Sequence, residues 1–98
     1  MAGDQPRWVD SHCHLFGSDE SPHALLDRAE AAGVDWVVCP GIDLETSLES
    51  RRIAFEHPDR VMWAAGLHPL DASSWAAQVG RMETLIAEAV AIGECGLD

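Results

Sequence analysis

The stretch VDWVVCP, residues 34–40, is a short run of apolar, aromatic and β-branched side chains that ends in a proline. Such a composition is typical of a buried β-strand. Three further runs of similar character occur along the chain: RWVDSH from Arg7, RVMWAAGLH from Arg60 and AVAIGECGL from Ala89. We therefore predict four strands, which open near residues 8, 34, 60 and 90.

The segments between these runs have the features of amphipathic helices. In SPHALLDRAEAAG, residues 21–33, Ser21 is a favourable N-cap and Pro22 suits the first helical position. The second helix is predicted to begin near Asp43 and to end before Pro58, because proline disfavours helix at the residue that precedes it. We expect this second helix to bury three apolar side chains: Leu44, Leu48 and Phe55. The third segment repeats apolar residues at steps of four and three, the spacing of one helical face: Trp75, Val79, Met82, Ile86 and Ala89.

The alternation of strands and helices gives the order βαβαβαβ, which predicts a parallel sheet with right-handed crossovers. Repeats of about 26 to 30 residues fit either a doubly wound sheet or a (β/α) barrel. A complete (β/α)8 barrel needs eight units and roughly 250 residues, whereas this chain has 98. We therefore predict a single α/β domain, residues 1–98, that is either a small open sheet or a (β/α)3β unit, the N-terminal half of a TIM-type barrel.

The charge balance limits the partners that the chain can bind. Seventeen acidic residues against six arginines and no lysine give a formal net charge of −11. This balance offers no general basic surface for DNA or RNA, so a phosphate-bearing substrate requires a local site, such as bound cations, that reverses the field. No apolar run reaches the roughly 18 residues that a membrane span needs, and the first residues lack a secretory signal. We expect a cytoplasmic protein, without a membrane partner, whose Cys13, Cys39 and Cys95 stay reduced.

Histidines follow the first and third predicted strands, and a glutamate interrupts the fourth. His12 and His14 lie in VDSHCHL, residues 9–15, His68 lies in GLHP, and Glu94 lies in AIGECGLD. In parallel α/β folds, ligand sites form at the carboxyl ends of the strands. These four residues are therefore the candidates for a functional site, although His68 could instead simply begin a loop.

His12 and His14 are candidate metal ligands, although two polar residues in an ordinary turn would give the same short pattern. Because side chains alternate along a strand, both imidazoles project to one side and Cys13 to the other, so the pair can chelate one ion. Glu94 would supply the balancing charge, since a buried carboxylate is costly without a partner. An exposed position at a fraying strand end is the alternative for Glu94. Its neighbour Gly93 has no side chain and would therefore allow another main-chain segment or a ligand to come close to the chain beside Glu94.

Together, VDSHCHL, GLHP and AIGECGLD resemble the motifs of the TatD-type metal-dependent hydrolases, a deoxyribonuclease family of amidohydrolase-like TIM barrels. The three motifs follow in the right order at the ends of predicted strands and span nearly the whole chain. The resemblance implies a phosphodiesterase that cleaves DNA, or another phosphodiester, through water activated by two divalent cations of Zn²⁺, Mn²⁺ or Mg²⁺. It also implies that His12 and His14 bind the first cation and that Glu94 bridges both. His68 would lie near the substrate phosphate, so that Glu94 and His68 are the catalytic residues.

The same resemblance implies two further histidines and an aspartate on later strands, which this chain does not include. We therefore expect the isolated 98 residues to be catalytically silent and only marginally stable, as a fragment of a longer enzyme. Two other functions are left open. The same pair of cations would polarise a carbonyl, so the substrate could contain a carbon–nitrogen or ester bond, as in an aminoacyl-tRNA. The other is a non-catalytic open α/β module that binds a partner through its exposed edges.

Overall fold

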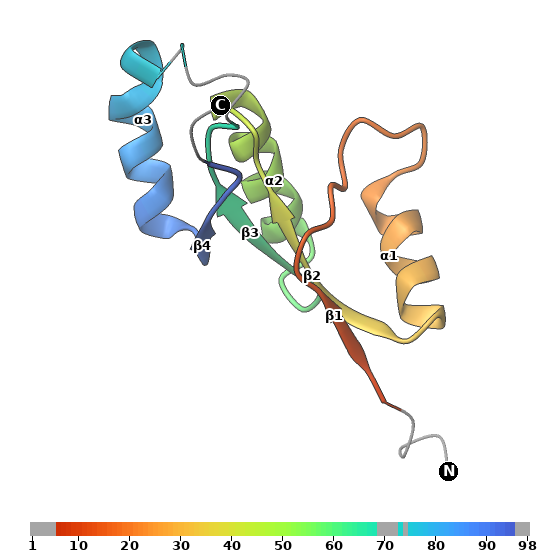
Figure 1. Cartoon of the computed structure of the whole chain (residues 1–98). Coiled ribbons are helices and arrows are strands. Elements are labelled where there is room, and N and C mark those ends of the chain that lie inside the picture. The colour runs from red at the N-terminus through yellow and green to blue at the C-terminus, as the bar shows by residue number, and fades with distance from the viewer. Residues whose placement is uncertain (1–5, 69–72, 74, 96–98) are drawn as a thin grey trace.

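The computed structural model describes residues 6–68, 73 and 75–95 of the 98-residue chain. The elements, in chain order, are β1 (Trp8–Asp10), α1 (Pro22–Ala31), β2 (Val34–Pro40), α2 (Leu44–Glu56), β3 (Val61–Ala65), α3 (Trp75–Glu88) and β4 (Ala91–Ile92) (Figure 1). The four predicted strands and three predicted helices are therefore confirmed. The side chain of Trp75 and the last three residues of AIGECGLD, among them Asp98, lie outside the described part. None of the helices within that part has the length and apolar character that crossing a bilayer requires.

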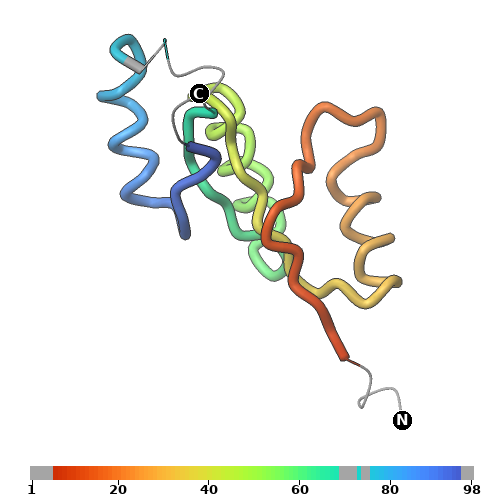
Figure 2. Tube along the Cα trace, in the orientation of Figure 1, coloured from red at the N-terminus to blue at the C-terminus, as the bar shows by residue number. Residues whose placement is uncertain are grey.

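The four strands form one sheet, in which each strand pairs in parallel with its neighbour in the chain. The order is β1-β2-β3-β4, so β1 and β4 lie at the two edges. The sheet curls, and the three helices lie around its outer side (Figures 1 and 2). A doubly wound sheet reverses its strand order, whereas a sequential order belongs to a (β/α) barrel. The chain therefore has the predicted α/β class and forms a (β/α)3β half of a TIM-type barrel.

Local sequence signals account for the limits of the first two helices. Ser21 caps α1 by accepting a hydrogen bond from the main-chain N–H of Ala24 at 3.2 Å. Gly33, where the chain turns from α1 into β2, has a φ of 98°, a left-handed conformation that favours glycine. Asp43 caps α2: its carboxylate accepts from the N–H of Thr46 at 2.8 Å, and the Thr46 hydroxyl accepts from the N–H of Asp43 at 3.0 Å. This reciprocal pair satisfies donors that the helix itself leaves unpaired.

The hydrophobic core lies between the sheet and the helices. Its buried members include Leu26 of α1, Val37 and Cys39 of β2, Ile53 of α2, Trp63 and Ala65 of β3, and Met82 and Leu85 of α3. Leu44 and Leu48 pack against this core, as predicted.

The predicted burial of Phe55 is wrong: it is 63% exposed, and the Arg51 guanidinium lies 4.9 Å from the centre of its ring. Phe55 follows Ile53 by two positions, about 200° around the helix, so the burial of Ile53 turns Phe55 outward.

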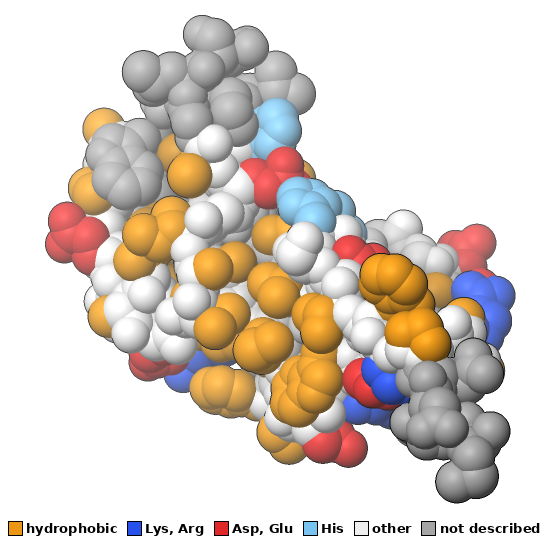
Figure 3. Space-filling model, turned by 60° about the horizontal axis from the view of Figure 1, so that its bottom comes forward, with side chains coloured by type: hydrophobic (Ala, Val, Ile, Leu, Met, Phe, Trp, Pro, Cys, Tyr) orange, Lys and Arg blue, Asp and Glu red, His pale blue; other side chains and the backbone are white. Residues whose placement is uncertain are grey.

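The two edge strands expose apolar side chains. Trp8 and Val9 of β1 are more than half exposed, and so are Val90 and Ile92 at β4. Figure 3 shows hydrophobic side chains gathered on one face of the molecule, with histidine and acidic side chains beside them. Both edge strands therefore leave apolar side chains exposed to solvent.

Candidate metal centre

His12 and His14 lie in the segment that follows β1. The N–H of Cys13 donates to the carbonyl of Val38 at 3.0 Å, so the pairing of β1 with β2 continues through this segment. The Asp10 carboxylate accepts a hydrogen bond from the N–H of His12 at 3.0 Å. Cys13 packs against the core, while the two histidine rings meet edge to face with their centres 4.9 Å apart. The alternation predicted from the sequence therefore separates the cysteine from the histidine pair.

The Glu94 carboxylate lies among three imidazoles. Its Oε2 atom is 2.8 Å from Nε2 of His14 and 3.2 Å from Nε2 of His12. Its Oε1 atom is 3.5 Å from Nε2 of His68. The side chain of Glu94 is 24% exposed, so it is neither buried alone nor frayed into solvent. All four predicted site residues are thus brought together, although 80 positions separate His14 from Glu94.

The donor atoms of this cluster fit a divalent cation. One nitrogen from each of His12 and His14 and one carboxylate oxygen of Glu94 lie within 4.8 Å of one another. Ligand atoms bound about 2.1 Å from a single ion are roughly 3 to 4 Å apart, so small adjustments would place these three around one cation. Two imidazoles and a carboxylate are ligands that suit Zn²⁺ and Mn²⁺, and carboxylates also bind Mg²⁺.

Close main-chain packing places Glu94 against the ends of β2 and β3. The N–H of Glu94 donates to the carbonyl of Gly41 at 2.8 Å, and the N–H of Gly93 donates to that of Ala65 at 2.9 Å. A Cβ added to Gly66 would overlap the main chain of Gly93 and Glu94, so this approach requires glycine. The main chain of Gly93 does approach another segment closely, as predicted, but the position that requires the absence of a side chain is Gly66, since a Cβ on Gly93 would meet nothing within 4 Å. Gly41 and Gly66 were not predicted as positioning residues. The feature of the sequence that could have indicated them is that each glycine directly follows a strand.

His68 lies three residues after β3 and is tied to the end of β2. Its N–H donates to the carbonyl of Ile42 at 2.7 Å. Its side chain is 32% exposed and faces Oε1 of Glu94. His68 therefore places its imidazole beside the carboxylate of Glu94, and the loop that it was predicted to begin lies outside the described residues.

Arginines neutralise carboxylates away from this cluster. Arg7 pairs with Asp35 and Arg60 with Asp27, and in each case the hydrogen bond from the guanidinium lowers the pKa of the carboxyl group. Within the described part of the chain, Glu94 forms its ion pairs with histidines alone. Because no arginine pairs with Glu94 within the described residues, a bound cation is the group that could neutralise this carboxylate.

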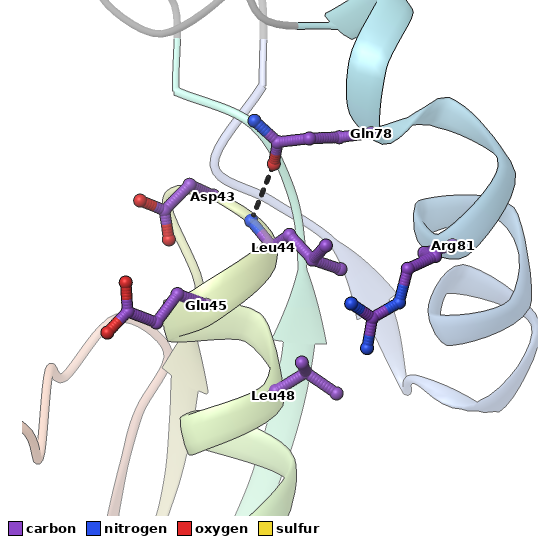
Figure 4. A pocket seen from close by; sticks show the side chains of 6 residues that line it. All are labelled: Asp43, Leu44, Glu45, Leu48, Gln78 and Arg81. Atoms are coloured by element: carbon purple, nitrogen blue, oxygen red, sulfur yellow. Dashed lines mark hydrogen bonds between the residues drawn. The ribbon is translucent and has the colours of Figure 1, made fainter.

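A groove of about 420 Å³ lies between α2 and α3, in the outer helical layer. Its lining is drawn in Figure 4 and consists of Asp43, Leu44, Glu45, Leu48, Gln78 and Arg81. The N–H of Leu44 donates to the side-chain oxygen of Gln78 at 3.0 Å, which bridges the two helices. None of the predicted site residues lines this groove. The groove is therefore separate from the candidate site, which is the cluster around Glu94.

Comparison with known proteins gives one consistent family. A sequence model of the family described as TatD related DNase matches residues 9–98. The chain is 40% identical over 83 residues to the 3′-5′ ssDNA/RNA exonuclease TatD of Rahnella sp. (strain Y9602), across 82% of this chain and 32% of that protein. It is 43% identical over 79 residues to the 3′-5′ ssDNA/RNA exonuclease TatD of Yersinia pseudotuberculosis serotype O:3 (strain YPIII), across 78% and 30%. The chain thus spans about a third of the length of the curated relatives that it matches.

Proposed function

The chain belongs to the family of TatD-related DNases, and from this membership we propose that it carries metal-binding residues of a hydrolase that cleaves phosphodiester bonds in single-stranded nucleic acid. The relatives described above are named as 3′-5′ ssDNA/RNA exonucleases, which supports DNA or RNA as the substrate over a carbonyl compound. The observation that carries the proposal is the position of the Glu94 carboxylate between Nε2 of His12 and Nε2 of His14.

His12, His14 and Glu94 are the proposed ligands of a first cation. Glu94 would also contact a second, because Oε2 faces the histidine pair and Oε1 faces His68. Divalent cations at such a site activate water for attack and neutralise charge on phosphate oxygens. Two cations of Zn²⁺, Mn²⁺ or Mg²⁺ are thus proposed for the complete site.

His68 is proposed to act on the substrate beside this centre. Its Nε2 atom lies 3.5 Å from Oε1 of Glu94, the carboxylate oxygen other than the one that faces the histidine pair. An imidazole in this position can donate a hydrogen bond to a phosphate oxygen or hold a proton while the substrate binds. Glu94 and His68 are therefore the proposed catalytic residues.

The acidity of the chain supports a substrate that is held through cations. A formal net charge of −11 repels phosphate at long range. Because Glu94 has histidine partners rather than arginine partners, bound cations are the source of positive charge that could reverse this field locally. The proposal includes a cytoplasmic location, in which Cys39, buried in the core, stays reduced.

Calorimetric titration with Mn²⁺ tests the proposed centre. The wild-type chain should bind the ion saturably, and Glu94→Gln should weaken binding by more than roughly a hundredfold, since even a residue that only supports a ligand is worth about tenfold to a hundredfold. His57→Ala is a matched control, because it removes an imidazole that stacks on His23 outside the cluster. Its affinity should equal that of the wild type. Equal affinities in the wild type and in Glu94→Gln would refute the metal centre.

Activity is a separate test of the substrate. We expect the 98 residues alone to leave a labelled single-stranded oligonucleotide intact in the presence of Mn²⁺, because the chain spans about a third of the length of its relatives. The resemblance also assigns further ligands to later strands. Metal-dependent shortening of the oligonucleotide by this chain, lost in Glu94→Gln, would contradict the expected inactivity.

A further inference from the structure

Ser47 lies in the first turn of α2, next to the loops that carry the candidate metal centre. Its side chain is fully buried. The hydroxyl accepts a hydrogen bond from the N–H of Gly66 at 3.2 Å and donates one to the carbonyl of Gly66 at 3.3 Å. Because a buried polar group without a partner is costly, this single side chain stabilises both polar main-chain groups of Gly66.

Gly41 packs directly on the same serine. A Cβ on Gly41 would overlap Ser47, so the two residues are in close contact. The carbonyl of Gly41 accepts the hydrogen bond from the N–H of Glu94 at 2.8 Å. Gly66 in turn lies against the main chain of Glu94. Ser47 therefore contacts both of the glycines that hold the main chain of Glu94.

We propose that Ser47 is a positioning residue that acts through these two glycines on Glu94. Without the hydroxyl, the buried N–H and carbonyl of Gly66 would lose their hydrogen bonds to Ser47. The main chain at Gly66, which lies against Glu94, would then no longer be held in one position. The carboxylate would then no longer be held beside the two imidazoles, so the affinity for the metal would fall although all three ligands are still present. This inference rests on the proposed metal centre.

Ser50 provides a matched control one helical turn further along α2. It is also fully buried, and its hydroxyl accepts a hydrogen bond from the thiol of Cys39 at 3.5 Å. That contact belongs to the core between α2 and β2. Ser50→Ala therefore removes the same hydroxyl from the same helix, but from a contact that does not lead to Glu94.

Metal titration of the two alanine variants tests the positioning role. Ser47→Ala should bind Mn²⁺ about tenfold to a hundredfold more weakly than the wild type, whereas Ser50→Ala should bind it with wild-type affinity. The visible absorption of bound Co²⁺, which depends on ligand geometry, should change only in Ser47→Ala. Circular dichroism establishes that both variants are folded at the temperature of the titration. Wild-type affinity and an unchanged Co²⁺ spectrum in folded Ser47→Ala would overturn the inference.

Two further variants keep the outcomes distinct. If Ser47→Ala does not fold, Ser47→Cys replaces it: a thiol keeps a similar volume but makes weaker hydrogen bonds. Reduced Mn²⁺ affinity in Ser47→Cys would then support the positioning role, and wild-type affinity would overturn it. Glu94→Gln reports on the proposed centre itself. If Glu94→Gln binds Mn²⁺ like the wild type, the proposed function fails; if it loses binding while Ser47→Ala does not, only the role of Ser47 fails.

Discussion

At the scale of single residues, Glu94 has separate partners for its main chain and its side chain. Its N–H is held by the carbonyl of Gly41, and its carboxylate faces His12 and His14. Gly66 permits both sets of contacts, because it lets the main chain of Glu94 approach the end of β3. The geometry of the candidate centre thus depends on a residue that has no side chain.

Replacing Gly66 with alanine should weaken metal binding and destabilise the fold. The new methyl group would overlap the main chain of Gly93 and Glu94, and overpacking of this kind typically costs about 1–3 kcal/mol. Urea denaturation and Mn²⁺ titration measure the two effects. In Gly80→Ala, the control, the new methyl group would meet nothing within 4 Å. That change should leave metal affinity unaltered and stabilise α3 by about 0.5–1 kcal/mol. Wild-type metal affinity in Gly66→Ala would contradict the role of the close approach.

At the scale of elements, an ion pair joins the edge strand β1 to β2. Nε and Nη2 of Arg7, which precedes β1, donate to Oδ1 of Asp35 in β2 at 2.9 and 2.6 Å. This hydrogen bonding lowers the pKa of Asp35 below its ordinary value of 3.8. Because β1 has only three residues, a side-chain link adds to a short series of main-chain bonds.

The link between Arg7 and Asp35 should make the stability of the chain depend on pH in the acidic range. A carboxyl group whose pKa is lowered by folding binds fewer protons in the folded state than in the unfolded state. Its contribution is therefore present above the unfolded pKa and is lost as the pH falls through the folded value. Arg7→Met should flatten the decline in the free energy of unfolding below about pH 4, measured by urea denaturation at a series of pH values.

Arg81→Met is the control for this pH series. It removes the same charge from an arginine that forms no ion pair among residues 6–68, 73 and 75–95. The acidic decline in its free energy of unfolding should match that of the wild type. A decline of equal steepness in Arg7→Met and in the wild type would show that the ion pair contributes nothing measurable.

At the scale of the whole molecule, the ligands of the proposed centre come from the two edges of the sheet. His12 and His14 follow β1, and Glu94 follows β4, with β2 and β3 between them. In a flat sheet, three strand spacings of about 4.8 Å would separate the two edge strands by about 14 Å. The curl seen in Figure 2 therefore brings the two ends together and creates the cluster.

Metal binding should stabilise the entire fold, because it would link the two edges of the sheet. An ion that binds the folded chain alone, at a hundred times its dissociation constant, adds about 2.7 kcal/mol to the free energy of unfolding. Thermal unfolding followed by circular dichroism should show a higher melting temperature with Mn²⁺, and EDTA should reverse the increase. Glu94→Gln should lose this shift, whereas His57→Ala should keep it. A wild-type melting temperature that does not respond to saturating Mn²⁺ would argue against the link.

Neighbours in the chain account for the predictions that the structure confirms. The strand from Val34 and the caps at Ser21 and Asp43 depend on side chains a few positions away, so their patterns can be read directly. The burial of Phe55 was predicted wrongly because it depends on which helical face packs on the sheet. The contact of Gly66 with Gly93 and Glu94 was not predicted because it depends on how closely two strand ends approach.

The sequence by itself determined the order of the elements, the starts of the first two helices and the residue types at the strand ends, because these depend on local periodicity and capping. The alternation of side chains also predicted that His12 and His14 project to one side and Cys13 to the other, in the segment that follows β1. Only the tertiary structure decided that this pair lies beside Glu94, that Gly66 packs against the main chain of Glu94, and that Ser47 hydrogen-bonds to Gly66. The physical reason is that these contacts join segments far apart in the chain, and the curl of the sheet sets their distances.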